Sequence, residues 1–475
     1  MTLPFPLPRI IQGGMGVAVS NWRLANAVAR TGQLGVVSGS MLDTVFVRRL
    51  QDGDPGGHVR RAIAAFPVAA VGEEILRRYY NPNGRAAGVP YKNLPMYKQH
   101  VSDARQRVTV LANFVEVWLA KEGHAGPVGL NLLTKVQMPN LASLYGAMLA
   151  GVDVVIMGAG IPREIPGVLD ALAEHKAAQI KFEIEGIARD ETEFLRFDPS
   201  SCLSHAVDER TLKRPAFFAV ISAASLAATL ARKSNGRVDG FVVEGPTAGG
   251  HNAPPRGELR LNELGEPIYG DRDAVDLAKM RELGLPFWLA GGFGSPERLD
   301  EAIASGAAGI QVGTLFAYCE ESGLTPEIKS RVLTAVTDGT VSLRTDPRAS
   351  PTGYPFKVVE MPGEPERVAA RQRICDLGYL RVPVRTPDGR TVYRCSAEPV
   401  DAYVAKGGDA ADTVGRRCLC NGLTATVGQA QWRAATNEEE IPLVTSGDDL
   451  LALGSFAAAN PAYSADQVVR YLCHR

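Results

Sequence analysis

Short apolar runs that end in glycine recur from the N-terminus to about residue 315, and stretches with helical spacing of apolar positions separate them. The first run, residues 9–15, breaks into a Gln-Gly-Gly-Met-Gly turn, and a helical pattern then extends through Arg30. Buried parallel strands read as short continuous apolar runs, whereas the helices that cover them are amphipathic with a period of about 3.6 residues. This alternation predicts parallel βα units.

Eight such runs occur, which is enough for a closed barrel of parallel strands. A barrel of this kind needs about 250 residues, and the chain has 475. We therefore predict an α/β fold, a (β/α)8 TIM barrel over residues 1–325, with an inserted segment and a mainly helical C-terminal extension over residues 326–475. The runs lie at residues 9–15, 34–39, 128–133, 152–157, 217–222, 238–243, 287–290 and 309–312.

Two stretches interrupt the barrel pattern. Residues 50–125 are long for a barrel connection, which normally takes a few residues and one helix, so they predict an insertion over one end of the barrel. Residues 180–215 contain two strand-like segments and predict a β-hairpin outside the barrel sheet. Four tyrosines of the insertion could line an entrance or be half-buried loop aromatics, of which we favour the second: Tyr79, Tyr80, Tyr91 and Tyr97.

The C-terminal extension is predicted to cap the barrel mouth or to form a subunit interface, and a homodimer is one possibility. Its Thr-Pro-Asp-Gly-Arg sequence between Val384 and Val392 predicts a β-hairpin turn. Four of its cysteines could bind zinc or an iron–sulfur cluster: Cys375, Cys395, Cys418 and Cys420. Because paired Cys-x-x-Cys spacing is absent, we favour free buried thiols and predict no metal.

Composition narrows the classes of partner. The 51 Lys and Arg residues balance the 52 Asp and Glu residues, so charge gives no case for binding nucleic acid or an anionic membrane. No apolar run approaches the roughly 18 residues that a membrane span needs, and the proline-rich start lacks the basic and apolar regions of a signal peptide. Seven thinly spread cysteines are not typical of a disulfide framework, and we expect free thiols. We expect a cytoplasmic protein with a small-molecule substrate.

Glycines at the ends of the last two strands predict a phosphate site. Gly291 and Gly292 follow the seventh run, and Gly313 follows the eighth. A (β/α)8 barrel often binds phosphate at this place, because backbone N–H groups can approach the anion where no Cβ intervenes. The site suits the phosphate of flavin mononucleotide (FMN). The alternative is that these glycines only form tight turns, but two such positions on successive strands favour the site.

His251 is the candidate catalytic residue. It follows two glycines in the loop after the sixth run, at the end of the barrel where active sites lie, and an imidazole can exchange protons near neutral pH. A histidine that only bonds its own loop is the alternative. Glu244 in the same loop is a possible second polar group, and Asn131, an amide inside an apolar strand, could meet a flavin ring edge.

Four motifs in this order resemble the nitronate monooxygenase family, formerly called 2-nitropropane dioxygenases. They are Gln-Gly-Gly-Met at residues 12–15, Thr-Ala-Gly-Gly-His at 247–251, Ala-Gly-Gly-Phe-Gly at 290–294 and Gly-Ile-Gln-Val-Gly-Thr at 309–314. The resemblance covers residues 9–325 and implies a flavoprotein that oxidises alkyl nitronates with O2. His251 would take the proton α to the nitro group. The FMN contacts that it implies are Gly13, Gly14, Met15, Asn131, Gly249, Gly250, Gly291, Gly292, Gly313 and Thr314.

The chain also departs from the best-studied class of that family. Gly13-Gly14-Met15 replaces an Ala-Pro-Met turn, and the loop at residues 159–162 is closer to the NAD(P)H:quinone reductase branch. The hairpin at 180–215 and the long extension resemble enoyl reductase subunits of fatty acid and polyketide synthases. An NAD(P)H-dependent reductase of quinones or enoyl thioesters is therefore the alternative enzyme. A non-catalytic flavin-binding assembly module is a further alternative.

Overall fold

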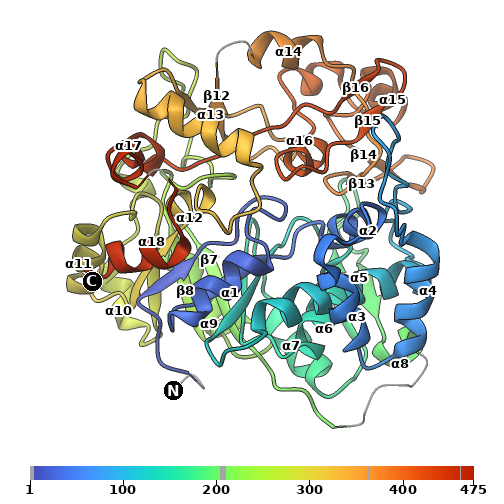
Figure 1. The fold of residues 1–475 in the computed structure, drawn as a ribbon, viewed down its shortest axis with the longest axis horizontal. Helices are drawn as coiled ribbons and strands as arrows, with labels where there is room; N and C mark the ends of the chain where they lie inside the picture. The colour runs from blue at the N-terminus through green and yellow to red at the C-terminus, as the bar shows by residue number, and fades with distance from the viewer. Residues whose placement is uncertain (1–4, 204–209, 362–363, 461, 475) are drawn as a thin grey trace.

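Eight parallel strands form one barrel in the computed structural model, which describes residues 5–203, 210–361, 364–460 and 462–474 (Figure 1). Their hydrogen-bonded order is β1-β10-β9-β8-β7-β4-β3-β2, and a parallel bridge between Ile11 and Leu34 joins β1 to β2. The eight apolar runs therefore predicted the fold correctly. The strands are β1 (Ile10–Gln12), β2 (Gly35–Ser38), β3 (Val128–Leu133), β4 (Val154–Gly158), β7 (Ala216–Ile221), β8 (Gly240–Glu244), β9 (Phe287–Ala290) and β10 (Gly309–Val312).

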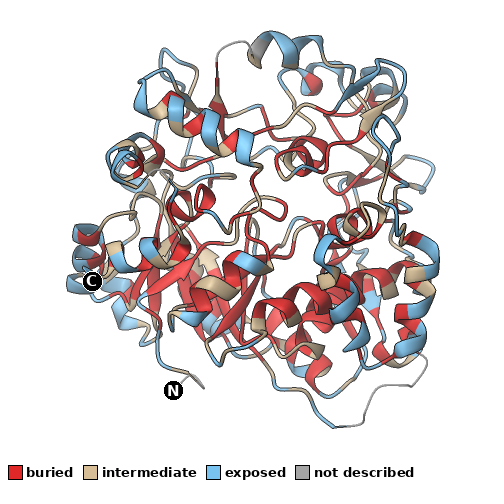
Figure 2. Cartoon of the chain, viewed as in Figure 1, coloured by how far each residue is buried: buried red, intermediate tan, exposed pale blue. Residues whose placement is uncertain are grey.

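Large apolar side chains fill the barrel interior. Ile11, Ile156, Phe218 and Trp288 belong to one cluster of fully buried residues, and the rings of Phe218 and Trp288 stack with centroids 4.7 Å apart. The Trp288 indole N–H donates to the Pro8 carbonyl at 2.8 Å, which satisfies its polar atom. Figure 2 shows the strands as a continuous buried layer. Because side chains pack the interior, space for a ligand remains only at an end of the barrel.

The helices between strands begin where the sequence indicates. The Asn21 side chain accepts from the backbone N–H groups of Arg23 and Leu24 and caps the first helix, and Ser295 caps the helix that starts at Pro296. Such caps satisfy backbone donors that have no partner inside the helix. The helices are α1 (Trp22–Arg30), α6 (Asn140–Leu149), α7 (Ile165–Ala173), α9 (Ala224–Lys233), α10 (Leu277–Glu282), α11 (Pro296–Ala304) and α12 (Thr314–Ala317), with a short η2 (Asp271–Asp273) before α10.

The insertion lies between β2 and β3 and is helical. It comprises α2 (Leu42–Gln51), η1 (Pro55–Gly57), α3 (His58–Ala64), α4 (Ala69–Tyr79) and α5 (Asp103–Lys121). Its tyrosines line no entrance to the large cavity described below, so that possibility was wrong. Tyr79, Tyr91 and Tyr97 are buried rather than half-buried. The Tyr91 hydroxyl donates to the half-buried carboxylate of Asp52, and the Tyr97 hydroxyl donates to the buried carboxylate of Asp43.

A hairpin stands outside the barrel sheet. β5 (Ala178–Phe182) and β6 (Glu193–Phe197) pair in antiparallel orientation, and α8 (Pro199–Cys202) follows them. Residues 204–209 of the stretch predicted as a hairpin lie outside the described residues, as do residues 1–4, on which part of the signal-peptide argument rests. Among the described residues, no helix is long and apolar enough to cross a membrane.

The C-terminal extension lies over one end of the barrel (Figure 1). Besides helices, its described residues form three antiparallel strand pairs, of which the sequence indicated only the one with its turn at residues 386–390. The elements are α13 (Pro326–Thr337), β11 (Ser342–Asp346), β12 (Phe356–Glu360), α14 (Glu364–Ala370), β13 (Val382–Arg385), β14 (Thr391–Arg394), α15 (Val400–Ala405), η3 (Ala410–Thr413), α16 (Leu419–Ala425), β15 (Trp432–Arg433), β16 (Glu438–Glu439), α17 (Asp449–Ala459) and α18 (Ala465–Leu472).

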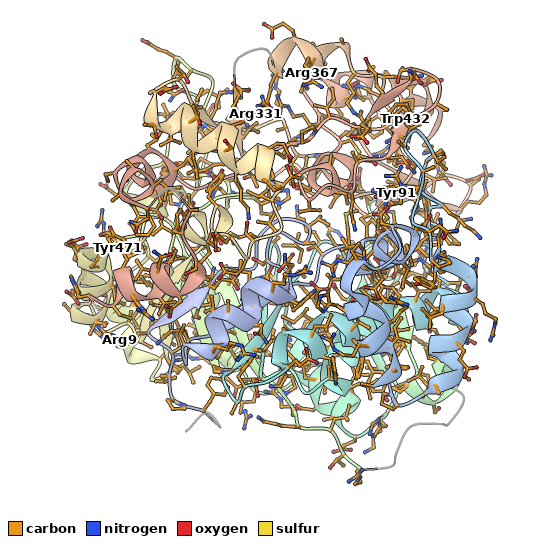
Figure 3. All side chains as sticks on the ribbon, viewed as in Figure 1. Arg9, Tyr91, Arg331, Arg367, Trp432 and Tyr471 are labelled. Carbon is orange, nitrogen blue, oxygen red and sulfur yellow. The ribbon has the colours of Figure 1, made fainter. Side chains whose placement is uncertain are left out.

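The insertion and the extension are joined by polar contacts. Tyr91 and Trp432, labelled in Figure 3, lie on the same side of the molecule, and the Tyr91 backbone N–H donates to the Gln431 side chain at 2.7 Å.

A buried ion pair lies nearer the barrel. The Arg105 guanidinium is 2.7 Å from Asp43, and their side chains are 5% and 2% exposed.

Two tyrosines also donate hydrogen bonds to Asp43. Tyr97 and Tyr379 both donate their hydroxyls to its carboxylate, and Tyr379 belongs to the extension. Burial acts to raise the pKa of Asp43, but the Arg105 guanidinium and these hydrogen bonds outweigh it and hold the pKa below its ordinary value. The ion pair is therefore charged, and it connects α2, α5 and the extension.

Candidate active site

A cavity of about 470 Å³ lies at the carboxyl ends of the barrel strands. Pockets of this size commonly hold cofactors and small ligands. The barrel brings to this one place all of the residues that the sequence analysis named as flavin contacts or as base. Residues lining the cavity include Gly13, Gly14, Met15, Asn131, Gly249, Gly250, His251, Gly291, Gly292, Gly313 and Thr314.

Two of these glycines lie close to side chains from other strand ends. A Cβ built on Gly14 would lie 2.3 Å from Cβ of Asn131, so no larger residue fits there unless Asn131 moves. A Cβ on Gly313 would lie 3.4 Å from Sδ of Met15. Because Gly14 and Gly313 have no side chains, the C-terminal ends of β1, β3 and β10 can approach one another closely.

The turn after β9 needs glycine for its backbone conformation. Gly291 and Gly292 have φ of +87° and +74°, in the left-handed region that residues with a Cβ rarely adopt. A Cβ on Gly291 would also lie 2.8 Å from the backbone nitrogen of Ala248 in the β8 exit loop. These glycines keep the backbone of the β9 turn bare where it faces the cavity, as a phosphate site requires.

A segment of the extension, residues 443–449, forms part of the cavity wall. Thr445 Oγ1 accepts from the backbone N–H of Gly250 at 2.8 Å, and the backbone N–H of Gly447 donates to Thr314 Oγ1 at 3.0 Å. A Cβ on Gly249 would lie 2.7 Å from the carbonyl carbon of Ser446. Gly249 therefore also makes room for this segment, which no local sequence pattern indicated.

His251 is held in place by the extension. Its backbone forms an antiparallel bridge with Phe356 of β12. The two rings meet edge to face, with their centroids 4.9 Å apart. The imidazole Nε2 lies 2.7 Å from Ser350 Oγ. Burial lowers its pKa to about 4, and the nearby Lys135 ammonium also lowers it. The imidazole is therefore neutral at neutral pH, and Ser350 fixes one ring nitrogen. Sequence reasoning found His251 but not Ser350.

Glu244 is the second titratable group of the cavity. It ends β8 and lines the cavity, and its carboxyl forms no salt bridge with any residue that the structure describes. Burial raises its pKa to about 7. Near neutral pH the cavity therefore contains a neutral imidazole and a carboxyl group that is partly protonated. Groups with such shifted pKa values in a pocket are typical of catalytic sites.

Gln311 supports the binding of a group with polar edges. It lies on β10 and lines the cavity, and its buried Oε1 has no hydrogen-bond partner among the residues that the structure describes. A buried acceptor left unpaired costs about 1–3 kcal/mol, so a bound ring with an N–H donor would satisfy it. Asn131 adds a half-buried amide whose Nδ2 makes only a long contact, 3.4 Å, to the Ile156 carbonyl. These two amides fit the polar edge of a flavin.

Replacing Glu244 with glutamine should change the pH dependence of stability in the flavin-free protein. Because the folded pKa of about 7 lies above the ordinary value of 4.5, the unfolded chain ionises first, and wild-type stability falls as pH rises between these values. The variant should match wild type closely at pH 5 and exceed its unfolding free energy by up to about 3 kcal/mol at pH 8. Urea unfolding at both pH values measures this difference. An equal difference at both would contradict the raised pKa.

One known protein family matches part of the chain. The model of the nitronate monooxygenase family matches residues 163–349, which include β7 to β10 and the loop with His251. Over residues 163–349, less than half of its length, the chain is therefore similar to the nitronate monooxygenase family.

Two curated relatives match over short stretches. An octahydroindene-carboxyl-CoA dehydrogenase from Mycobacterium tuberculosis is 33% identical over 103 residues, which are 22% of this chain and 26% of that protein. The enzyme of the same name from Rhodococcus jostii is 33% identical over 122 residues, 26% of this chain and 29% of that protein. The chain thus spans less than a third of the length of these relatives.

Solved structures resemble the chain over nearly its whole length. FabK from Thermotoga maritima has 15% sequence identity and a TM-score of 0.46, and the superposition covers 98% of this chain and 92% of that one. A nitroalkane oxidase from Streptomyces ansochromogenes has 15% identity and a TM-score of 0.44, covering 99% and 95% of the two chains. Likeness at this level carries no argument about function.

Proposed function

We propose, with the match of residues 163–349 to the nitronate monooxygenase family as the premise, that the protein binds FMN in the large cavity and oxidises alkyl nitronates with O2. One observation carries the proposal. Every residue that the family resemblance marks for FMN or for proton transfer lines the same cavity at the carboxyl end of the barrel.

The chain offers separate groups for the two ends of FMN. The bare backbone at Gly291, Gly292 and Gly313 suits the phosphate, and the amides of Asn131 and Gln311 suit the ring edge. When bound, FMN supplies the redox chemistry. The protein contributes binding, orientation and the exclusion of water, since apolar side chains and residues 443–449 close much of the cavity.

His251 is the proposed base. Its neutral imidazole can take the α-proton of a nitroalkane, which converts that substrate into its nitronate. The contact with Ser350 Oγ orients the ring. Glu244, with a pKa of about 7, is the group whose charge changes near neutral pH, and its ionisation would place a negative charge in the cavity with an anionic nitronate. We therefore expect nitronate oxidation to slow above pH 7.

An NAD(P)H-dependent reductase of quinones or enoyl thioesters is the second candidate. The observation in its favour is that the two curated relatives are dehydrogenases of a CoA thioester. A neutral His251 could donate a hydrogen bond to a thioester carbonyl as readily as it could accept a proton from a nitroalkane.

Anaerobic mixing distinguishes the two candidates. The purified protein is mixed with an alkyl nitronate, with NADPH and with NADH, and the flavin absorbance is followed. Bleaching by the nitronate alone supports the proposed function, whereas bleaching by a nicotinamide alone makes the protein a reductase. A colourless protein that binds no added FMN contradicts both and favours a chain without flavin chemistry.

Gly14→Ala should weaken FMN binding. The new Cβ would overlap Asn131, and overpacking of this kind costs about 1–3 kcal/mol. We expect the dissociation constant of FMN to rise about 5- to 150-fold, measured by fluorescence titration of the flavin-free protein. Gly270→Ala is the matched control, because Gly270 has no atom within 4 Å of an added Cβ and a φ of -131°. Equal affinity of both variants would argue against FMN contact at Gly14.

A further inference from the structure

The lining of the large cavity contains two carboxyl groups and neither Lys nor Arg. Among the described residues that line it, Glu244 and Asp449 are acidic, and no side chain is a guanidinium or an ammonium. A phosphate monoester such as that of FMN carries a charge of about −1.5 to −2 at pH 7, and proteins commonly pair such a group with Arg or Lys. Here the partners available to the phosphate are backbone N–H groups, and carboxyl groups share the cavity with them.

Asp449 is the carboxyl group beside the glycine turn that follows β9. A Cβ built on Gly294 would lie 2.9 Å from Asp449 Oδ2, and the backbone N–H of Gly294 donates a hydrogen bond to the carboxyl group. Gly294 lies two residues after Gly292 and directly precedes Ser295, which caps α11. Backbone N–H groups at such a helix start are the donors that a phosphate uses. Asp449 therefore lies where the proposed phosphate site begins.

No ion pair neutralises Asp449. Its carboxyl group forms no salt bridge with any residue that the structure describes. The neighbouring Asp448 pairs with Lys357 Nζ at 2.6 Å, and Arg298, which acts on Asp449 electrostatically, forms an exposed ion pair with Glu301. Burial raises the pKa of Asp449, and the charge of Asp448 also raises it. A phosphate that enters the cavity would add negative charge to this uncompensated group.

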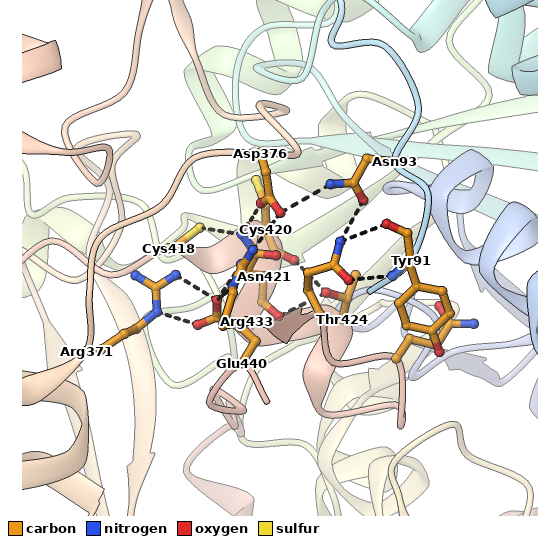
Figure 4. Close-up of polar contacts among 12 residues, drawn as sticks. Tyr91, Asn93, Arg371, Asp376, Cys418, Cys420, Asn421, Thr424, Arg433 and Glu440 are labelled. Carbon is orange, nitrogen blue, oxygen red and sulfur yellow. Dashed lines mark hydrogen bonds and ion pairs between the residues drawn. The ribbon is translucent and has the colours of Figure 1, made fainter. Parts of the chain in front are cut away.

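The fold holds Asp449 in this position. It ends the segment of the extension that forms part of the cavity wall. Figure 4 shows how the chain is held shortly before that segment: Arg371 and Arg433 both pair with the Glu440 carboxylate. At the other end of the segment, the backbone N–H of Asp448 donates into the β8 exit loop at 3.0 Å. The carboxyl group is therefore placed by contacts of the backbone on both sides of it.

We propose that Asp449 opposes the flavin phosphate, so that the cavity binds FMN little more tightly than riboflavin, which lacks the phosphate. This inference rests on the proposed function, because it takes a flavin to be the ligand of the large cavity. The backbone N–H groups of the glycine turns attract the phosphate, whereas the carboxylate repels it, and like charges brought together at a binding site lower affinity. Asp449 thus determines which form of the flavin the site prefers.

The test compares the two flavins on the full-length, flavin-free protein by fluorescence titration at pH 8. In the wild type, the dissociation constants of FMN and riboflavin should agree within about 10-fold. In Asp449→Asn, FMN should bind about 10- to 100-fold more tightly than in the wild type and riboflavin within about twofold, because only FMN has the opposed charge. Asp448→Asn is the matched control. It changes the neighbouring carboxylate, which does not line the cavity, and should leave the ratio of the two constants unchanged.

Several results would overturn the proposal. One is a wild type that binds FMN more than about 100-fold more tightly than riboflavin. Another is an equal change for both flavins in Asp449→Asn, which would assign Asp449 to the part of the flavin that both share. A wild type that binds neither flavin would contradict the proposed function as well, whereas binding of both with an unchanged ratio in Asp449→Asn would contradict this inference alone.

The wild type provides a second measurement if Asp449→Asn does not fold. Salt screens the repulsion between the carboxylate and the phosphate, so added NaCl should strengthen the binding of FMN relative to riboflavin. A relative weakening of FMN binding would show that the cavity attracts the phosphate and would overturn the proposal.

Discussion

Replacing His251 with alanine should lower the rate at which a nitroalkane bleaches the flavin about 100- to 10,000-fold, the usual contribution of a general base. The same variant should bleach with the corresponding nitronate at nearly the wild-type rate, because a nitronate has already lost the α-proton. The comparison isolates proton transfer from binding and electron transfer. Anaerobic stopped-flow absorbance with both forms of one substrate measures it.

Two controls accompany the His251 variant. His100→Ala removes an exposed histidine and should leave both rates unchanged. Ser350→Ala removes the contact to Nε2 and should slow the nitroalkane reaction less than His251→Ala does, since the base remains but loses its orientation. An equal loss of rate with nitroalkane and nitronate in His251→Ala would assign His251 to binding rather than to proton abstraction.

Removing the Asp43 carboxylate should produce the largest loss of stability. Asp43→Ala leaves the Arg105 guanidinium, whose side chain is 5% exposed, buried without its partner. Breaking such a pair from one side costs about 3–5 kcal/mol. We expect the free energy of urea unfolding at pH 7 to fall by this amount. Asp466→Ala, which removes one member of an exposed pair with Arg470, should cost less than about 1 kcal/mol.

The contribution of Asp43 to the free energy of unfolding should be lost only at low pH. Since the folded pKa lies below the ordinary value, the contribution is complete above the unfolded pKa of about 3.9 and is lost as the pH falls through the folded value. The difference between wild type and Asp43→Ala should therefore be constant from pH 5 to pH 8. A difference that shrinks within that range would show that the ion pair is not the source.

The barrel and most of its cavity could be predicted because their signals are local. A buried parallel strand needs a continuous apolar run, and a backbone that faces a ligand at the strand end needs glycine. Both requirements are visible within a few residues, as at Gly291 and Gly292, whose φ values are in the left-handed region. The helix starts at Asn21 and Ser295 are local signals of the same kind.

The remaining features depend on contacts between distant segments. Thr445 and Gly447 reach the cavity only because the extension folds back over the β8 and β10 exits, and Ser350 meets His251 through β12. The pKa values of Glu244 and His251 follow from burial, which residue type does not reveal. Likewise, the sequence spacing of the extension's cysteines did not indicate that they share one cavity.

The position of residues 443–449 bears on when a cofactor can enter. A ribosome makes the chain from its N-terminus, so all eight barrel strands emerge before this segment does. A nascent barrel that has its strands but not this segment lacks part of the cavity wall, which Thr445, Ser446 and Gly447 form in the finished protein. A cofactor that binds during synthesis therefore meets no such wall, whereas one that binds the finished protein meets a cavity whose wall includes this segment, hydrogen-bonded to Gly250 and Thr314.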